Sequence, residues 1–379
     1  MEKTICDKVE ALGPDLIQSV IAMVNIPSVK SQPVPGAPFG IETKKALEKA
    51  LDISQALGFD TQIIENAVGY AAWGAGEDYI GVLGHVDVVP EGKGWQDPPF
   101  SGSIREEKIF GRGVLDNKGP IMAALYGLYA LKSLGIPLKR PVRILFGTDE
   151  ESGFADIPLY LKHEKPPLAG FTPDCKYPVV YSERGRAQVS VSQAHGTENY
   201  VEATQVFFDY LNQYLLVNPT SGSQLGIDYS HPDYGITEMR NFKLQSDPDQ
   251  WHYRWSISYP PGITIDQIGH QIEATLPPGM TYHCHANYPP VYFDKESQMV
   301  KSMQKAYEYI TGQDGSPVTT TGGTYAKVMP NIVPFGPSFP GQKGISHLPN
   351  EYMDIEDLIN NAKIYALAIY YLANDTLAD

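Results

Sequence analysis

A histidine and an aspartate lie together at the end of a predicted strand. The apolar segment Tyr79–Leu83 leads into His85 and Asp87, and Pro90 closes the segment. Because successive side chains of a strand point to opposite faces, residues two apart share one face. A carboxylate beside an imidazole can fix its tautomer and raise its basicity, as a metal-bound histidine requires. A single His-x-Asp pair is more often an ordinary strand end, so this interpretation needs further ligand-type residues.

Three more carboxylates stand where a second strand and a helix begin or end. Glu150 and Glu151 follow the predicted buried strand Val142–Phe146, and two acids at an enclosed strand end need cations or protons. Asp116 belongs to a glycine-bounded turn before the helix that starts at Pro120. It precedes that helix by too many residues to be a simple N-cap, so it can project into a cleft.

Two residues would be unremarkable alone but extend this set. Asp174 would be an ordinary turn residue and His347 a surface histidine. The full set has two imidazoles and four carboxylates, which is more than one tetrahedral zinc needs and enough for two metals that share a carboxylate. We expect two divalent ions per chain, zinc first, although these donors also admit manganese or cobalt. The set is His85, Asp116, Glu150, Glu151, Asp174 and His347.

The elements that carry these residues predict an α/β fold with a mixed central sheet flanked by helices. Strands alternate with helices over the first 180 residues, and ligand sites in such sheets lie beyond the carboxyl ends of the strands. The predicted helices cover 16–24, 41–57, 120–134, 295–310 and 355–373, and the predicted strands cover 61–64, 70–73, 79–83, 104–110, 142–146 and 332–335.

The middle of the chain has a different pattern, β-α-β-β-α-β, which is typical of a small two-layer α+β domain of the ferredoxin-like type. Its predicted strands are 187–192, 238–244, 252–258 and 281–286, and its predicted helices are 200–215 and 264–275. We therefore expect one domain made of residues 1–179 and 289–379, which carries the ligand-type residues, and a small domain inserted at residues 180–288.

Composition limits the classes of partner. The 379 residues are 42% hydrophobic and 19% charged, which favours a large packed core, and the net charge of −15 argues against nucleic acid or an anionic membrane as a partner. The N-terminus lacks the apolar run of a signal peptide, and the late apolar run 365–373 is too short to span a bilayer. Three widely spaced cysteines fit reduced thiols, so we expect a cytoplasmic protein.

Six segments together resemble a known family. They are Gly84-His-Val-Asp-Val-Val-Pro90, Gly111-Arg-Gly-Val-Leu-Asp-Asn-Lys-Gly119, Thr148-Asp-Glu-Glu-Ser-Gly153, Thr172-Pro-Asp-Cys-Lys-Tyr-Pro178, Gly322-Gly-Thr-Tyr-Ala-Lys327 and Ser346-His-Leu-Pro-Asn-Glu351. In this order they resemble the di-metal aminoacylase, dipeptidase and glutamate-carboxypeptidase family, and most closely the bacterial dipeptidases of the V type. The resemblance implies a zinc-peptidase-like catalytic domain.

The resemblance also implies a role for each residue of the set. His85 and Asp174 would bind one metal, Glu151 and His347 the other, and Asp116 would bridge them, with a cis peptide bond after it. In the catalytic set, Asp87 would orient His85 and Glu150 would be the general base for the attacking water.

The segments implied to bind substrate match the family less well. His195, in Ala194-His-Gly196, would contact the oxyanion, but the residues after it depart from the family. The family's arginine for the substrate carboxylate is replaced by Ser258, so that Arg254 or Arg240 would have to substitute for it. Gly322, Gly323 and Thr324 complete the candidate substrate-binding residues.

These observations predict a metallopeptidase that hydrolyses small peptides, most simply a dipeptidase. Two alternatives stay open: an N-acyl amino acid deacylase or desuccinylase with the same metals, and a catalytically idle homologue that binds metal or small amino compounds. Dinucleotide and P-loop motifs are incomplete at Gly111–Gly113 and Gly336–Lys343. About 110 residues separate the two catalytic segments, which is room for one lid unit. The resemblance implies that family members with so short a lid dimerise through it, so we expect a homodimer through the inserted domain.

Overall fold

The computed structural model describes residues 1–375, and they divide into two compact units. Unit 1 comprises Met1–Tyr181, Phe293–Val318 and the described residues from Thr324 on, and unit 2 comprises Ser182–Tyr292 and Thr319–Gly323. Unit 2 thus includes a short late segment that the sequence-based boundaries assigned to the catalytic part. The chain passes between the units within β9 (Val180–Glu183), after β16 (Val291–Tyr292), within β17 (Val318–Thr320) and after Gly323. The strands β9, β16 and β17 form a small sheet.

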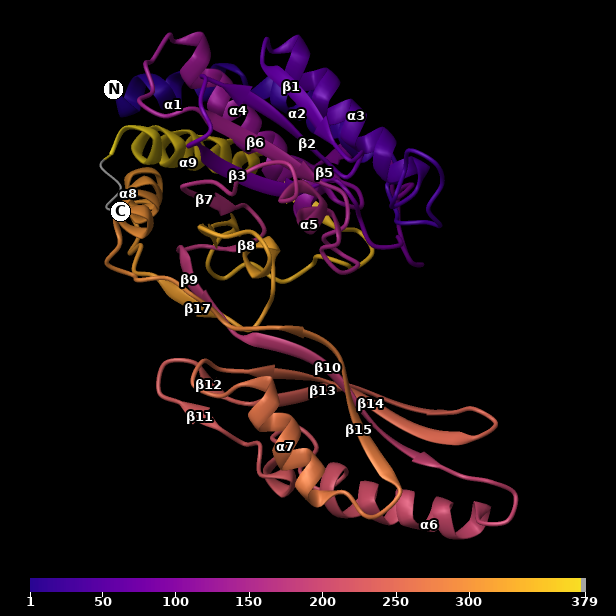
Figure 1. Cartoon of the computed structure of the whole chain (residues 1–379). Coiled ribbons are helices and arrows are strands. Elements are labelled where there is room, and N and C mark those ends of the chain that lie inside the picture. The colour runs from indigo at the N-terminus through magenta and orange to yellow at the C-terminus, as the bar shows by residue number, and fades with distance from the viewer. Residues whose placement is uncertain (376–379) are drawn as a thin grey trace. The chain divides into compact units, whose positions relative to one another are not determined.

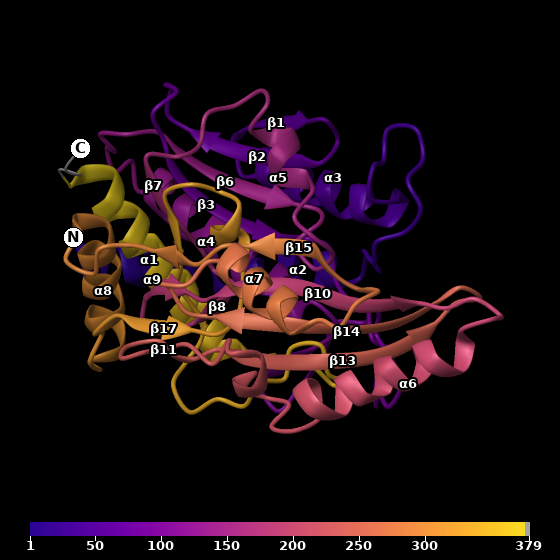
Figure 2. The same ribbon diagram turned by 60° about the horizontal axis from the view of Figure 1, so that its bottom comes forward.

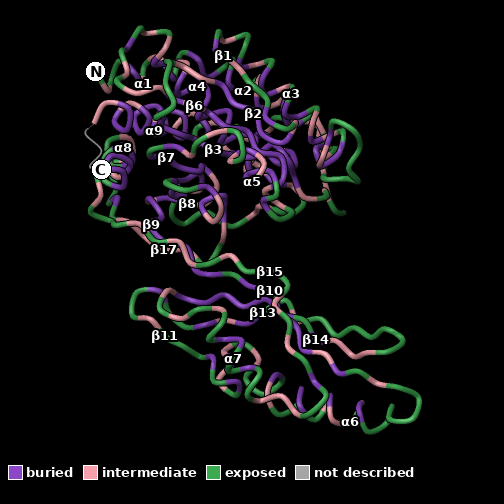
Figure 3. Tube along the Cα trace, in the orientation of Figure 1, coloured by how far each residue is buried: buried purple, intermediate pink, exposed green. Residues whose placement is uncertain are grey.

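Unit 1 is built on a six-stranded mixed sheet of order β1-β2-β6-β3-β7-β18 (Figure 1). The strands β3, β6, β7 and β18 run parallel to one another, and β2 is antiparallel to both of its neighbours, β1 and β6. Their bounds are β1 Asp60–Ile64, β2 Val68–Trp73, β3 Ile80–His85, β6 Val142–Gly147, β7 Ala169–Thr172 and β18 Ile332–Pro334. All residues of β3 and β7 are buried, which explains their continuous apolar character (Figure 3).

Helices cover this sheet on one face, and shorter elements cover the other. A Cβ at Gly84 would meet Ile121 of α4, whereas a Cβ at Gly147 would meet Tyr325 and Asp156, so these glycines face opposite sides. The helices of unit 1 are α1 Glu2–Ala11, α2 Gly13–Val24, α3 Ile41–Ala56, α4 Gly119–Ser133, α5 Asp156–Tyr160, α8 Gln298–Thr311 and α9 Ile355–Asn374. The long helices α4 and α9 are buried along most of their length because they pack against each other and the sheet.

One predicted strand of unit 1 is wrong. The segment 104–110 is not a single strand but a hairpin of β4 (Ser103–Arg105) and β5 (Lys108–Phe110), to which β20 (Tyr352–Asp354) adds. The turn residues Glu106 and Glu107 have φ values of 49° and 55°. Turns with this left-handed conformation are usually recognised by glycine or asparagine, and glutamates rarely adopt it. The sequence therefore gave no sign of the turn.

Unit 2 is a four-stranded antiparallel sheet of order β13-β14-β10-β15 with α6 and α7 on one face (Figures 1 and 2). Its elements follow the chain as β10 Gly185–Ala194, α6 Tyr200–Tyr210, β13 Glu238–Ser246, β14 Gln250–Tyr259, α7 Ile265–Thr275 and β15 Met280–Tyr288, which is the β-α-β-β-α-β order expected. Val189, Trp255 and Ile257 point to the helices and form the core with Phe207 and Ile268. The alternate residues of the strands therefore form a polar face on the other side of the sheet.

Candidate metal centre and catalytic site

Five residues form a cluster of possible metal ligands in unit 1, here called the ligand cluster: His85, Asp116, Glu151, Asp174 and His347. Two groups of three each offer ligand atoms within 4.8 Å of one another: the first is His85, Asp116 and Asp174, and the second is Asp116, Glu151 and His347. Asp116 belongs to both groups. This arrangement could therefore hold two ions with one shared carboxylate.

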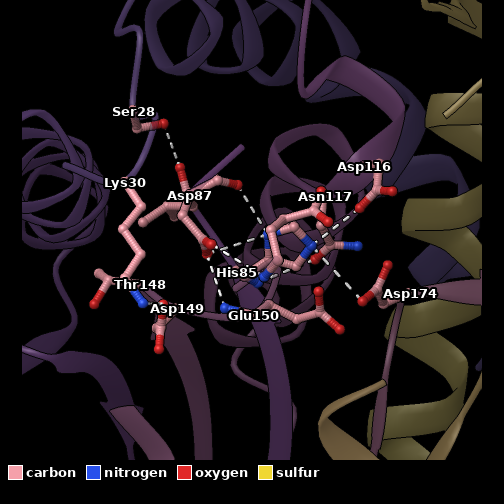
Figure 4. A network of polar contacts seen from close by, with 12 residues as sticks. Ser28, Lys30, His85, Asp87, Asp116, Asn117, Thr148, Asp149, Glu150 and Asp174 are labelled. Atoms are coloured by element: carbon pink, nitrogen blue, oxygen red, sulfur yellow. Dashed lines mark hydrogen bonds and ion pairs between the residues drawn. The ribbon is translucent and has the colours of Figure 1, made fainter. Parts of the chain in front are cut away.

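The distances place Asp116 between the two imidazoles. Its Oδ1 lies 3.0 Å from Nε2 of His85 (Figure 4). Its Oδ2 lies 3.2 Å from Nε2 of His347. The Oδ2 atom of Asp174 lies 3.7 Å from Nε2 of His85, and Oε1 of Glu151 lies 2.9 Å from Nε2 of His347. Each histidine therefore turns one nitrogen to the carboxylates of its group.

The strand β3 and the loop after it position His85. The ring ends a fully buried strand, and its Nδ1 lies 2.9 Å from the main-chain oxygen of Asp87 and 3.4 Å from Oδ1 of the same residue. The carboxylate of Asp87 also accepts the N–H groups of Glu150 and Glu151, each at 3.2 Å. Asp87 thus fixes the ring of His85 and the loop that carries both glutamates, and only the first of these contacts was foreseen from the sequence.

Asp116 is held by its neighbours in the chain and by Glu351. It lies in the turn Val114–Lys118, where its own φ of −131° and ψ of 88° are not helical, and the peptide bond between Asp116 and Asn117 is cis. Oε1 of Glu351 accepts the N–H groups of Leu115 and Asp116 at 2.9 and 3.2 Å. The other oxygen of Glu351 accepts from Arg112 at 2.6 Å, and both side chains are buried.

The charges of the cluster show why it suits cations. Burial and the nearby charge of Asp116 raise the pKa of Asp174 well above its usual range, and burial raises the pKa of Glu151. Hydrogen bonds to Asp116 and Glu151 raise the pKa of His347 to about 10. The acids are therefore crowded enough to compete for protons, and divalent cations relieve the same repulsion. The donor set, two imidazoles and three carboxylates, is one that zinc accepts.

Glu150 is the acid of this site that is not in the ligand cluster. Burial and the charge of Asp174 raise its pKa well above the usual value. Within residues 1–375, its carboxylate has no hydrogen bond or ion pair, although its main-chain N–H is held by Asp87. A carboxylate with a raised pKa and no fixed partner can accept and return a proton during a reaction.

The loop of residues 148–155, here called the base loop, is anchored at two further points. Lys30 Nζ lies 2.6 Å from Oδ1 of Asp149, whose side chain is 1% exposed (Figure 4). Asp156 accepts the N–H groups of Thr148 and Asp149 and the hydroxyl of Tyr325. Sequence reasoning missed these partners because Lys30 and Tyr325 lie far from the loop in the chain.

A small pocket adjoins the ligand cluster. It has a volume of about 100 Å³, and Asp116 and Asp174 form part of its wall. The other lining residues are Leu115, Cys175, Pro337, Ser338 and Ser346. All of these residues belong to unit 1.

The remaining substrate-binding candidates are divided between the units. Thr324 belongs to unit 1, where its hydroxyl accepts the N–H of Ala326. His195 belongs to unit 2, and its ring packs against Tyr200 and Trp251 with centroid distances of 4.9 and 5.8 Å.

Arg254, also in unit 2, is exposed on β14, and Gly322 and Gly323 line a pocket of unit 2 that Arg254 does not line. In residues 1–375, no helix has the length and apolar character that crossing a membrane requires.

Comparison with known proteins gives related chains over nearly the whole length. A profile of the peptidase family M20/M25/M40 matches residues 81–371. YtjP of Bacillus subtilis (strain 168) is 29% identical over 451 aligned positions, which cover 95% of this chain and 97% of YtjP. The Beta-Ala-Xaa dipeptidase of Lactobacillus delbrueckii subsp. lactis is 28% identical over 428 positions, which cover 89% and 91% of the two chains.

Solved structures share the fold. Human carnosine dipeptidase 1 matches with a TM-score of 0.72 over 98% of both chains, at 15% sequence identity. This match and the sheet order described above confirm the mixed α/β fold expected from the sequence.

Proposed function

Because this chain belongs to the peptidase family M20/M25/M40, we propose that it is a metal-dependent dipeptidase that hydrolyses the amide bond of small peptides. The observation that carries the proposal is the pair of three-residue ligand groups that share Asp116, with the uncommitted acid Glu150 beside them. The dipeptidase named among the relatives supports the substrate class.

We assign the ligands as the resemblance implies. His85 and Asp174 would hold one ion, Glu151 and His347 would hold the other, and Asp116 would contribute to both, which agrees with the two groups of ligand atoms. Two divalent ions in such a site lower the pKa of a water molecule and polarise the scissile carbonyl. Zinc is our first assignment, and manganese or cobalt would use the same donors.

The protein's own residues then position groups and move the proton. Glu150 accepts the proton of the attacking water and delivers it to the leaving amine. Asp87 keeps Glu150 in place through the main-chain N–H and keeps the His85 ring in one tautomer. The raised pKa of Glu150 suits a group that must both take up and release a proton near neutral pH.

The test combines metal analysis with a substrate screen. The purified protein should contain about two divalent ions per chain and should cleave free dipeptides faster than N-acyl amino acids. A preference for N-acyl amino acids would make it a deacylase, and metal binding without hydrolysis of either class would make it an idle homologue.

Paired variants separate the base from the ligands. Glu150→Gln should lower kcat by roughly 10²- to 10⁴-fold with metal content unchanged. Glu151→Gln, the control on the adjacent residue, should lose metal instead. Loss of metal in Glu150→Gln would instead make Glu150 a metal ligand and Glu151 the candidate base.

We further propose a cytoplasmic homodimer formed through unit 2, with His195 contacting the oxyanion in the partner's site. The alignment with YtjP needs 451 positions for a chain of 379 residues, so the relative has residues that this chain lacks. We infer that the missing residues belong to the lid, where a second copy would take their place. The sheet of unit 2 ends in β13 and β15, and an edge strand offers unpaired main-chain groups to a partner.

A further inference from the structure

Tyr325 is a buried residue of unit 1 to which the proposed function gives no task. It belongs to the segment Gly322–Lys327, of which the first three residues were expected to bind substrate, and its side chain is 0% exposed. It begins a short helical turn, Tyr325–Lys327, in which the hydroxyl of Thr324 accepts the N–H of Ala326. The hydroxyl of a tyrosine buried this completely needs a partner inside the protein.

That partner is Asp156, the first residue of α5. The hydroxyl of Tyr325 donates to Oδ2 of Asp156, and the same oxygen accepts the N–H groups of Thr148 and Asp149 at 2.8 and 3.2 Å. The other oxygen of Asp156 accepts the N–H of Ile157 at 2.9 Å. Tyr325 therefore holds the carboxylate oxygen to which the first two residues of the base loop are bonded.

Gly147 makes room for this pair beside His85. A Cβ atom at Gly147 would lie 2.0 Å from the hydroxyl oxygen of Tyr325 and 2.6 Å from Oδ2 of Asp156, so a larger residue would displace both groups. Gly147 is the last residue of β6, and its partner in the register of β3 is His85. The hydrogen bond from Tyr325 to Asp156 thus lies next to the two strand ends that carry His85 and the base loop.

The ring of Tyr325 packs against two further parts of the site. Its centroid lies 6.4 Å from that of the His85 ring, at an interplanar angle of 80°, and 5.8 Å from that of the Phe154 ring. Aromatic pairs at such distances and angles attract each other beyond the area they bury. Because Phe154 is near the end of the base loop and Asp156 holds its start, one tyrosine contacts His85 and supports both ends of the loop.

From these contacts we infer that Tyr325 and Asp156 are positioning residues, which hold the base loop and so keep Glu150 in place for proton transfer. The inference rests on the proposed function in taking Glu150 as the general base. Glu150 directly follows the two residues whose N–H groups Asp156 accepts (Figure 4). Because displacing a reacting group by about 1 Å can cost about 100-fold in rate, the effect on catalysis should exceed the effect on folding.

The role of Asp156 should depend on pH. Burial raises the pKa of Asp156 to about 7, the hydrogen bond from Tyr325 opposes that rise, and the charges of Asp87 and Asp149 add to it. Asp149 is itself paired with Lys30. An ionised carboxylate is only an acceptor, whereas a protonated one has fewer lone pairs for its donors. Removing the Tyr325 hydroxyl should therefore leave more of Asp156 protonated near pH 7 and loosen the base loop.

The variant Tyr325→Phe tests the inference, because it keeps the ring and removes only the hydroxyl. On the full-length, metal-loaded protein, kcat for a dipeptide should fall by roughly 10- to 100-fold, with KM and metal content nearly unchanged. The loss should be largest near pH 7 and smaller at pH 9, where Asp156 is more fully ionised.

Tyr79→Phe is the matched control. Tyr79 is also a 0% exposed tyrosine of unit 1, and its hydroxyl donates to the main-chain oxygen of Lys165 at 2.9 Å, away from the base loop. This variant should lose stability through the same chemical change but keep the wild-type kcat and pH profile.

Asp156→Asn tests the same contact from its other side and keeps the inference testable if Tyr325→Phe does not fold. Its side chain cannot ionise, so kcat of the wild type relative to this variant should rise between pH 6 and pH 8. In the Asp156→Asn background, the loss caused by Tyr325→Phe should no longer depend on pH.

Amide hydrogen exchange separates the inference from the proposed function, since it needs no hydrolysis. The base loop should exchange faster in Tyr325→Phe than in the wild type and should be unchanged in Tyr79→Phe. If the wild type cleaves no peptide, the proposed function fails, while this difference in exchange still supports Tyr325 and Asp156 as the residues that hold the loop.

Two results would overturn the inference in a protein that does cleave dipeptides. One is a wild-type kcat in Tyr325→Phe at pH 7 with unchanged exchange of the base loop. The other is a loss of kcat that is equal at every pH and is reproduced by Tyr79→Phe, since Tyr325 would then contribute only to stability.

Discussion

The ion pair between Lys30 and Asp149 offers a quantitative test of how the base loop is held. The two charged atoms lie 2.6 Å apart, and the side chains are 36% and 1% exposed. The second oxygen of Asp149 accepts the N–H of Ala155 at 3.0 Å. Lys30→Met keeps most of the side-chain length and removes only the charge and the donor. We expect this variant to be less stable and less active, because Asp149 immediately precedes Glu150.

The expected size follows from the exposure of the two partners. A hydrogen bond to a charged group contributes about 1.5–3 kcal/mol to stability. Lys30 is more than one third exposed, so solvent screens the pair and lowers the expected contribution to about 1–2 kcal/mol, at and just below the lower end of that range. Lys3 and Asp7 have nearly the same separation, 2.7 Å, but are exposed, so Lys3→Met is a matched control that should not change stability measurably.

The loss should also depend on pH. Burial already raises the pKa of Asp149 above 3.8, and the hydrogen bond from Lys30 opposes that rise. Without Lys30 the pKa of Asp149 in the folded protein is higher than it is in the folded wild type. The wild type therefore gains stability relative to Lys30→Met as the pH rises through the two folded pKa values, and the difference is smallest near pH 4.

Urea unfolding of the wild type, Lys30→Met, Asp149→Asn and the double variant at several pH values measures this coupling directly. The coupling free energy should be about 1–2 kcal/mol at pH 8 and smaller at pH 5. A coupling near zero, or one that does not change with pH, would refute the reasoning. The value of kcat, measured at constant metal content, should fall in Lys30→Met and remain unchanged in Lys3→Met.

Three further predictions concern the metals, a buried acid and the assembly. Chelation should abolish hydrolysis and lower the melting temperature, and added divalent metal should restore both; full activity in a metal-free sample would exclude the two-metal site. Burial raises the pKa of Asp156 to about 7 from 3.8, so its stabilising contribution is lost as the pH rises from about 4 through 7. The stability of Asp156→Asn relative to the wild type should therefore improve between pH 5 and pH 8, as measured by denaturant unfolding at each pH, and a constant difference would contradict this. Light scattering should give twice the 41.8 kDa of one chain, and mixing inactive His195→Ala and Glu150→Gln chains should restore some activity; no recovery after subunit exchange would count against the shared site.

The site residues that were easiest to predict from the sequence are those at the ends of strands. His85 ends a strand, and Glu150 and Glu151 follow one, so strand periodicity and residue type together located them. The order of strands and helices in unit 2 was also readable because its sheet has alternating apolar and polar residues.

The supporting contacts could not be predicted, because they join residues that are distant in the chain. Lys30 and Asp149 are 119 residues apart, and Glu351 and Leu115 are 236 apart. No local pattern marks such a pair, and a charged residue by itself is most often solvated.

Two buried carboxylates outside the ligand cluster have the same structural task. The carboxylate of Asp87 accepts the main-chain N–H groups of Glu150 and Glu151. The carboxylate of Glu351 accepts those of Leu115 and Asp116. These bonds fix the ligand-bearing loops before any ion binds. Repulsion among the carboxylates of the cluster then destabilises the folded state. An ion that binds only the folded state removes this repulsion and stabilises the fold. Metal affinity and stability should therefore rise together, since the rest of the fold holds the ligands at separations that are unfavourable without a cation.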